Sequence, residues 1–292
     1  MVVSHIIGGI GNQMFQYAAG RALSLTNNQQ LLLDLSDFSD YRLHNGFELS
    51  RVFNVIAERA ETSTIHQLLG WRANRLVKKV LRRPQLAWLR GKNLVIEPHF
   101  NYWPDLFNLT DDCYLSGYWQ SERYFQFYTA TIRADFTFKS PLVSDNAALA
   151  EQIAQVNAVS LHVRRGDYVS NPKTTATHGV CSLDYYRAAI HLIVERIQQP
   201  YFYIFSDDIT WAKDNLKIDF PHQYVDYNHG LESYNDMHLM SLCQHHIIAN
   251  SSFSWWGAWL NPNMEKIVVA PRKWFANENN VKDLFPQDWV TL

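Results

Sequence analysis

Several features are scarce in this chain of 292 residues, and each scarcity excludes a class of protein. Cysteine occurs only three times, at Cys113, Cys181 and Cys243, without a CxxC pair, so we expect neither a disulfide framework nor a zinc site. The formal net charge is only −2, which argues against general nucleic-acid binding. No apolar run is long enough to span a membrane and no secretion signal is visible, so we expect a cytoplasmic protein.

The chain is instead 47% hydrophobic, and the apolar pattern predicts two α/β domains. A strand at 2–7, a helix at 13–25 and a strand at 31–35 form a βαβ unit, which requires a parallel sheet. Further strands are predicted at 94–102 and 113–118. Strands then alternate with helices. The predicted strands are 158–163, 201–205, 246–249 and 266–269. The predicted helices are 147–156, 183–198, 232–243 and 253–260. We therefore expect two Rossmann-like domains facing each other across a cleft, residues 1–156 and 157–292.

A glycine-rich turn follows the first predicted strand, at Gly8-Gly9-Ile10-Gly11-Asn12-Gln13. Glycines let the backbone approach a phosphate closely, and the N-terminus of the following helix favours an anion. The GxGxxG fingerprint of dinucleotide-binding folds is incomplete, because Met14 occupies the third glycine position, although Asp34 stands where such folds keep a ribose-binding acid. A nicotinamide-dependent oxidoreductase and a tight turn without a ligand are therefore alternatives.

The most informative segment is 159–168, where a short apolar run ends in His162, Arg164, Arg165 and Asp167. Ligands of α/β folds gather outside the carboxyl ends of the strands. Each guanidinium presents a planar fork of N–H donors that suits phosphate oxygens. We therefore predict a substrate that bears a pyrophosphate. For Asp167 the alternative is an ion pair with Arg165 that only closes the loop.

Two acids, Asp207 and Asp208, follow the predicted strand at 201–205. Their carboxylates can accept hydrogen bonds from a nucleotide base or from ribose hydroxyls. A helix N-cap is the alternative, because Asp is favoured there. We expect no metal, since two adjacent acids without a further acid cluster do not form a cage.

A third polar loop leads from a strand into a helix at 249–257. Exposed N–H groups and hydroxyls at a helix N-terminus are typical of a phosphate seat. The residues assigned to this seat are Asn250, Ser251, Ser252, Phe253 and Ser254. Trp255, Trp256 and Trp259 either stack on a ligand or form a buried helix face.

A basic stretch at 65–92 interleaves eight Lys and Arg residues with leucine and valine. One interpretation is a surface that meets anionic lipid or a lipid-linked acceptor through residues 72–92. We favour an ordinary helix with a solvated face.

Four motifs together resemble the bacterial α1,2-fucosyltransferases of glycosyltransferase family 11. They are Gly9 to Ala18, His162 to Tyr168, Phe205 to Asp208 and Asn250 to Gly257, in the order of that family. The resemblance implies a GT-B architecture and GDP-β-L-fucose as donor, with inversion at the anomeric carbon and without a metal or other cofactor. It implies a galactoside acceptor, such as lactose or an O-antigen unit, whose 2-hydroxyl is fucosylated. A sugar-nucleotide-binding module without turnover is the non-enzymatic alternative.

The resemblance also implies roles for individual residues. Arg164 would hold the β-phosphate, with support from His162 and Arg165. The Asp207-Asp208 pair and residues 250–254 would contact guanosine and the phosphates. From the other domain, Asn12 would reach the reacting carbon, and the pyrophosphate would meet Gly9, Gly11 and Gln13. Asp167 is the first candidate for the general base, and His178, on a loop at 174–179, is the second.

Overall fold

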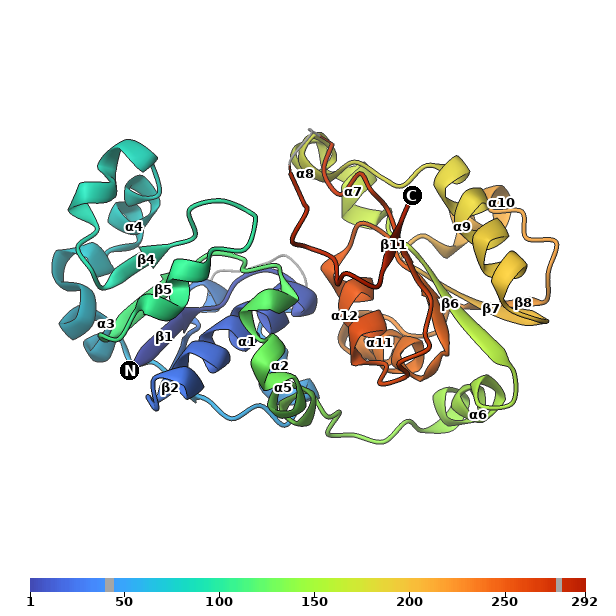
Figure 1. Cartoon of the computed structure of the whole chain (residues 1–292), viewed down its shortest axis with the longest axis horizontal. Helices are drawn as coiled ribbons and strands as arrows, with labels where there is room; N and C mark the ends of the chain where they lie inside the picture. The colour runs from blue at the N-terminus through green and yellow to red at the C-terminus, as the bar shows by residue number, and fades with distance from the viewer. Residues whose placement is uncertain (40–44, 277–279) are drawn as a thin grey trace. The chain divides into compact units, whose positions relative to one another are not determined.

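The computed structural model describes residues 1–39, 45–276 and 280–292. Its contacts divide the chain into two compact units, residues 1–139 with 281–284 and residues 140–280 with 285–292. Each unit is built around one parallel sheet covered by helices (Figure 1). The division falls earlier than residue 156, the boundary expected from the sequence, because the helix at Ser144–Ile153 packs on the second sheet.

The first unit has a five-stranded sheet in the order β3-β2-β1-β5-β4, with every pairing parallel. Its strands are β1 (Val2–His5), β2 (Leu31–Asp34), β3 (Glu58–Arg59), β4 (Leu94–Ile96) and β5 (Cys113–Ser116). Its α-helices are α1 (Ile10–Thr26), α2 (Leu49–Val52), α3 (Thr62–Leu69), α4 (Arg75–Leu81) and α5 (Thr129–Asp135). The strand predicted at 94–102 is shorter in the structure: it ends at Ile96, and the Glu97 N–H makes the last bond to β5, donating to the Ser116 carbonyl.

Strand β1 shows why this sheet needs helices on both faces. Ser4 faces α1, and Gly20 lets that helix approach closely, since a Cβ at Gly20 would lie 3.0 Å from the Ser4 Cβ. Val3 points to the opposite face and belongs to one apolar cluster with Leu69 of α3 and Leu81 of α4. With both faces covered, all four residues of β1 are buried.

The basic stretch at 65–92 is broken into short pieces. Gly70, with φ +58°, ends α3, and a 3-10 turn, η2 (Gly70–Ala73), follows. Asn74 then caps α4 by accepting hydrogen bonds from the backbone N–H groups of Leu76 and Val77. Pro84 opens the 3-10 turn η3 (Pro84–Leu89). The prediction of one ordinary helix over this stretch is therefore wrong.

The second unit has a six-stranded parallel sheet in the order β11-β10-β9-β6-β7-β8. Its strands are β6 (Asn157–Val163), β7 (Pro200–Ser206), β8 (His222–Val225), β9 (His245–Ile247), β10 (Val268–Ala270) and β11 (Val290–Thr291). Its helices are α6 (Ser144–Ile153), α7 (Gly166–Ser170), α8 (Pro172–His178), α9 (Leu183–Arg196), α10 (Ile209–Asn215), α11 (Tyr234–Leu242) and α12 (Ser252–Leu260).

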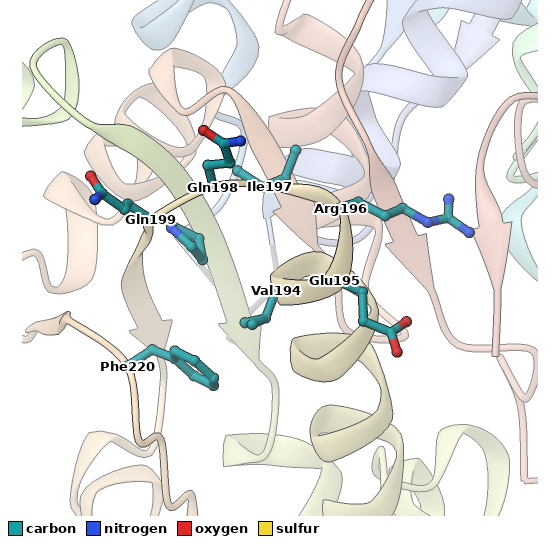
Figure 2. Close-up of a pocket in the computed structure, with 8 residues that line it drawn as sticks. Val194, Glu195, Arg196, Ile197, Gln198, Gln199 and Phe220 are labelled. Atoms are coloured by element: carbon teal, nitrogen blue, oxygen red, sulfur yellow. The ribbon is translucent and has the colours of Figure 1, made fainter.

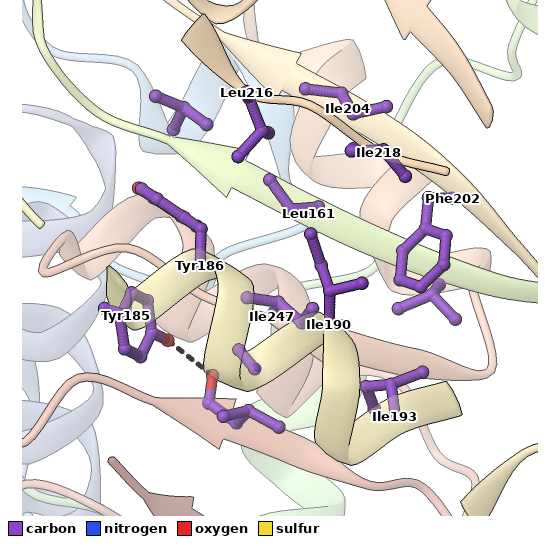
Figure 3. Close-up of a cluster of buried hydrophobic side chains, with 14 of the residues drawn as sticks. Leu161, Tyr185, Tyr186, Ile190, Ile193, Phe202, Ile204, Leu216, Ile218 and Ile247 are labelled. Atoms are coloured by element: carbon purple, nitrogen blue, oxygen red, sulfur yellow. Dashed lines mark hydrogen bonds between the residues drawn. The ribbon is translucent and has the colours of Figure 1, made fainter. Parts of the chain in front are cut away.

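Side chains of β7 alternate between two apolar clusters. Phe202 and Ile204 pack with α9 and α10, as Figure 3 shows for the α9 side, where Tyr185 donates a hydrogen bond to the Val269 carbonyl over 3.0 Å. Tyr203 and Phe205 pack on the other face with α6 and α11. Ser182 caps α9, since its hydroxyl accepts a hydrogen bond from the backbone N–H of Tyr185.

Candidate functional site

Three neighbouring strands of the second sheet bring the predicted polar loops together. Strand β6 lies between β9 and β7, and all three run parallel. The Arg pair follows β6, the Asp pair follows β7, and the loop into α12 follows β9. Tyr168 ties two of these loops by donating a hydrogen bond to the backbone carbonyl of Asn250 over 3.2 Å. The carboxyl end of this sheet therefore carries both cations and a helix N-terminus.

Two ion pairs join the loops after β6 and β7. Arg164 Nη1 lies 3.0 Å from Asp207 Oδ2, and Arg165 Nε lies 3.2 Å from Asp208 Oδ2. The backbone N–H of Arg165 also donates to Asp207 Oδ1 over 2.8 Å. The Arg165 guanidinium stacks 3.8 Å above the ring centroid of Trp211, and Asp208 caps α10. The N-cap alternative holds for Asp208, while Asp207 orients Arg164.

Gly166 makes the close packing of these loops sterically feasible. A Cβ built at this position would lie 2.6 Å from Asp207 Oδ2, inside any real contact distance. Any side chain at residue 166 would therefore displace the carboxylate that holds Arg164.

His162 lies near the end of β6, two residues before Arg164, and is 5% exposed. Burial, with the neighbouring charge of Arg164, lowers its pKa to about 4, and the charge of Asp207 opposes this shift. The imidazole is therefore neutral near pH 7. Its ring lies 5.7 Å from that of Phe253 in the first turn of α12. Its Nδ1 is buried without a hydrogen-bond partner among the described residues, so a polar group is available next to the helix N-terminus.

Three of the residues predicted to form the phosphate seat make contacts within the protein. Asn250 is buried, and its side-chain amide donates to the carbonyls of His178 and Trp274. Ser251 caps α12 through the N–H of Phe253, and buried Ser254 donates back to the Ser251 carbonyl. These three residues build the helix N-terminus. Ser252 and Phe253 are the partly exposed members of the set.

The tryptophans of α12 form core rather than a stacking platform. Trp255 and Trp256 are fully buried, and Trp259 is 4% exposed. Their rings pack against one another with centroids 5.0 to 6.3 Å apart. Of the two alternatives, the buried helix face is correct.

The two candidate bases lie on α7 and α8. The side chain of Asp167 is outside the described residues. His178 ends α8 instead of lying on a loop, so the loop predicted at 174–179 is wrong. The His178 ring stacks on Tyr168 at 4.8 Å and packs 5.5 Å from the ring of Phe275.

The glycine turn belongs to the first unit and is fixed by amide side chains. Gly8 adopts φ +89°, and Gly9 is the N-cap of α1. Gln13 is fully buried, donating to the carbonyls of Gly8 and Gly46 and accepting from the N–H of Glu48. Gln13 therefore holds the turn, and buried Gly11 lies inside α1.

Asn12 is partly exposed, and its Oδ1 accepts a hydrogen bond from Gln120 Nε2 over 2.7 Å. Gln120 was not expected at this turn, because it is distant in the sequence and lies in the loop after β5. Glu97 holds this loop by accepting from the N–H groups of Tyr118 and Trp119. Burial raises the pKa of the Glu97 carboxyl to about 7, although these two hydrogen bonds act to lower it.

Asp34 is engaged within the first unit. It is 1% exposed, and it accepts hydrogen bonds from the Tyr114 hydroxyl at 2.5 Å and from Lys78 Nζ at 3.3 Å. Burial alone would raise its pKa, but the bonds from Tyr114 and Ser36 and the charge of Lys78 lower that pKa to about 2. A carboxylate held in this way is not presented to a ribose, which disfavours the nicotinamide alternative.

We expect Asp34→Asn to destabilise the protein by about 2 kcal/mol near pH 7, because the folded protein lowers the pKa of this carboxyl from its ordinary value to about 2. Because the folded pKa lies below the ordinary value, this contribution is present above about pH 4 and is lost as the pH falls towards about 2. Urea unfolding of both proteins at pH 7 and pH 3 measures it. Asp111→Asn, which removes the exposed partner of Lys92, is the control and should leave the stability nearly unchanged. A constant difference across pH would contradict this origin.

Metal-ligand clusters, disulfides and cavities in the described chain point to no second catalytic site. Within the described ranges, no cluster of His, Cys, Asp and Glu could hold a metal ion, and no helix is long and apolar enough to cross a bilayer. All three cysteines are free. A shallow hollow lined by Val194, Gln199 and Phe220, among others, lies where β7 begins (Figure 2). It is therefore remote from the carboxyl end of the sheet.

Comparison with known proteins identifies relatives along the whole chain. The model of glycosyl transferase family 11 matches residues 102–292. An alpha-1,2-colitosyltransferase of Escherichia coli is 37% identical over 100% of this chain and 99% of its own. The O-antigen biosynthesis glycosyltransferase WbnK of E. coli is 35% identical over 99% of both chains. Galactoside alpha-(1,2)-fucosyltransferase 2 of Rattus norvegicus is 24% identical over 89% of this chain and 67% of its own.

Solved structures share the fold at low sequence identity. The alpha-1,6-fucosyltransferase NodZ of Bradyrhizobium, soaked with GDP-fucose, has a TM-score of 0.55 at 15% identity, over 89% of this chain and 92% of its own. A mutant of Arabidopsis thaliana FUT1 in complex with GDP has a TM-score of 0.52 at 11% identity, over 92% of this chain and 70% of its own. The GT-B type of fold expected from the sequence, with two parallel α/β sheets, is confirmed.

Proposed function

The chain belongs to glycosyl transferase family 11, and on that premise we propose that it transfers L-fucose from GDP-β-L-fucose, with inversion, to the 2-hydroxyl of a terminal galactose. The acceptor is a galactose-terminated oligosaccharide, such as lactose or an O-antigen repeat unit, and the reaction takes place in the cytoplasm. The names of the rat and E. coli relatives support the α1,2 linkage and a role in O-antigen synthesis.

The observation that carries the proposal is the pair of Arg residues held by Asp207 and Asp208 at the carboxyl end of the second sheet. Two guanidiniums beside the N-terminus of α12 suit the two negative phosphates of a nucleoside diphosphate. We therefore assign the nucleotide to the second unit and the acceptor to the first, where Asn12 borders the glycine turn.

The proposed reaction is a single displacement at fucose C1. The acceptor oxygen forms a bond to C1 while the bond from C1 to the β-phosphate oxygen breaks, and GDP leaves with the electron pair. Negative charge therefore develops on the β-phosphate, where Arg164 and the first N–H groups of α12 stabilise it. The acceptor hydroxyl loses its proton to a general base, for which Asp167 is our first candidate and His178 the second.

The test is release of GDP from GDP-fucose with lactose as acceptor, in the presence of EDTA, with GDP-mannose as the control donor. Release that depends on lactose and on fucose, together with an α1,2 linkage in the product, is the expected result. Release from GDP-fucose without any acceptor requirement, or no binding of GDP by calorimetry, would overturn the proposal.

A second candidate donor is GDP-linked colitose, because the alpha-1,2-colitosyltransferase of E. coli is 37% identical to this chain. Both donors would use the same diphosphate contacts, so the Arg pair does not distinguish them. Measuring kcat/KM with each donor and one acceptor decides between them, and a larger value for the colitose donor would replace fucose in the proposal.

We expect Gly166→Ala to lower turnover by about tenfold or more, because the added Cβ displaces Asp207 and misplaces Arg164. Steady-state rates measure the loss, and the melting temperature shows whether the fold is kept. The control is Gly230→Ala, where no atom lies within 4 Å of an added Cβ; its φ of +57° adds a backbone strain that Gly166 does not have. Equal rates for wild type and Gly166→Ala would show that Asp207 does not position Arg164.

A further inference from the structure

We propose that the outer face of α4 and the adjoining turns η2 and η3 bind the surface of an anionic phospholipid bilayer. We call this face the α4 surface and define it by Trp71, Leu76, Lys79, Val80, Arg83 and Trp88. The inference does not depend on the transferred sugar, because these residues lie in the first unit and outside the proposed nucleotide site.

The first observation is an uneven distribution of charge along the chain. Between Glu61 and Glu97 there are eight Lys and Arg residues and no acidic residue. Since the whole chain has a net charge of −2, the remainder carries −10. A basic segment in an otherwise acidic chain attracts an anionic surface locally.

The structure separates the basic residues with structural contacts from those that face solvent. Lys78 donates to Asp34 and Tyr114, and Lys92 pairs with Asp111. Lys79 and Arg83 are exposed, and no carboxylate in the described part of the chain lies within 4.0 Å of either side chain. These two charges are therefore available to lipid phosphates.

The helical spacing of α4 places charged and apolar groups on one exposed arc. With about 100° per residue, Lys79 lies beside Leu76 and Val80, while Leu81 turns inward. Arg83 follows the helix and is the N-cap of η3. Leu76 is 73% exposed and Val80 is 47% exposed. An isolated apolar residue on a surface is ordinary, but two at i and i+4 next to basic residues form an amphipathic face.

Two indoles extend this face beyond the helix. Trp88 in η3 is 78% exposed and Trp71 in η2 is 56% exposed. The turns that carry them are fixed, because Arg72 donates to the carbonyl of Leu89 and Arg90 donates to that of Leu81. Tryptophan favours the interface between headgroups and acyl chains. Exposed indoles and aliphatic side chains among the basic residues therefore favour a bilayer over duplex DNA, whose phosphates would contact the charges and not the aliphatic groups of Leu76 and Val80.

Flotation of the full chain with vesicles tests the proposal. We expect binding to vesicles of phosphatidylcholine with phosphatidylglycerol, and little binding to phosphatidylcholine alone. The double variant Lys79→Glu with Arg83→Glu should bind at least about tenfold more weakly, because each basic residue near the surface contributes to attraction. Trp88→Ser should weaken the binding that persists at high salt. Far-UV circular dichroism and turnover on a soluble acceptor should be unchanged in all variants.

Matched controls exist elsewhere on the chain. Phe127→Ser removes a side chain that is 86% exposed, and Lys217→Glu reverses an exposed charge in the second unit. Both should bind anionic vesicles as the wild type does. Equal loss in these controls, binding that ignores lipid charge, or no vesicle binding while the chain retains duplex DNA on a filter would each overturn the proposal.

Discussion

Arg164→Ala should lower the turnover of the GDP-sugar by about 10²-fold or more, the loss typical of a missing donor to a developing oxyanion. Arg164 is the cation that Asp207 orients at the end of β6, and the β-phosphate gains its negative charge during departure of GDP. The deficit should therefore fall mainly on kcat. Single-turnover rates with saturating GDP-fucose and lactose measure it.

Arg187→Ala is the matched control, because Arg187 lies in the same unit but forms an exposed pair with Asp184 on α9. Its turnover should equal that of the wild type. A near-wild-type rate for Arg164→Ala would remove the phosphate assignment, while a collapsed melting curve would show that the ion pair supports folding instead.

Trp256→Ala should destabilise the protein by about 3–5 kcal/mol, as expected when a fully buried indole is truncated and the surroundings relax only in part. Trp256 packs edge-on against Trp255 and Trp259, at 5.0 and 5.1 Å, so the cavity would open at the centre of the aromatic cluster. Urea denaturation, monitored by far-UV circular dichroism, measures the free energy of unfolding.

The control for size and chemistry is Trp88→Ala, which removes the same side chain from an exposed position. That change should stay within about 0.5 kcal/mol of the wild type. If Trp256→Ala proved equally mild while GDP binding weakened, the indole would be a ligand contact after all.

Much of the site in the second unit follows from the sequence. An apolar run that ends in polar residues predicts a buried parallel strand and a loop at its carboxyl end, and this logic located the loops after β6, β7 and β9. The short strand β8 was not predicted, because residues 222–224 are only half-buried and show no alternation of apolar and polar side chains.

The sequence could not decide which polar side chains at a strand end face a ligand and which face the backbone. Asn250 and Gln13 both satisfy buried carbonyls, a role that depends on segments distant in the chain, such as Trp274 and Gly46. Gln120 likewise reaches Asn12 from a different part of the chain, and no local pattern signals that contact. Gly70 and Pro84 mark the helix breaks in the basic stretch. The regular spacing of basic and apolar residues across them nevertheless led to the prediction of one continuous helix.

The ion pairs between the loops after β6 and β7 have a thermodynamic consequence. Since Asp207 and Asp208 orient both guanidiniums and Trp211 stacks on one of them, little side-chain entropy remains to be lost when a nucleotide arrives. Binding of GDP should therefore lose less entropy, by calorimetry, in the wild type than in a variant such as Asp207→Asn that frees Arg164. Because these side chains are already ordered, GDP can be exchanged for a new donor without reordering the two loops. The main cost of each exchange is then the change in hydration of the two guanidiniums.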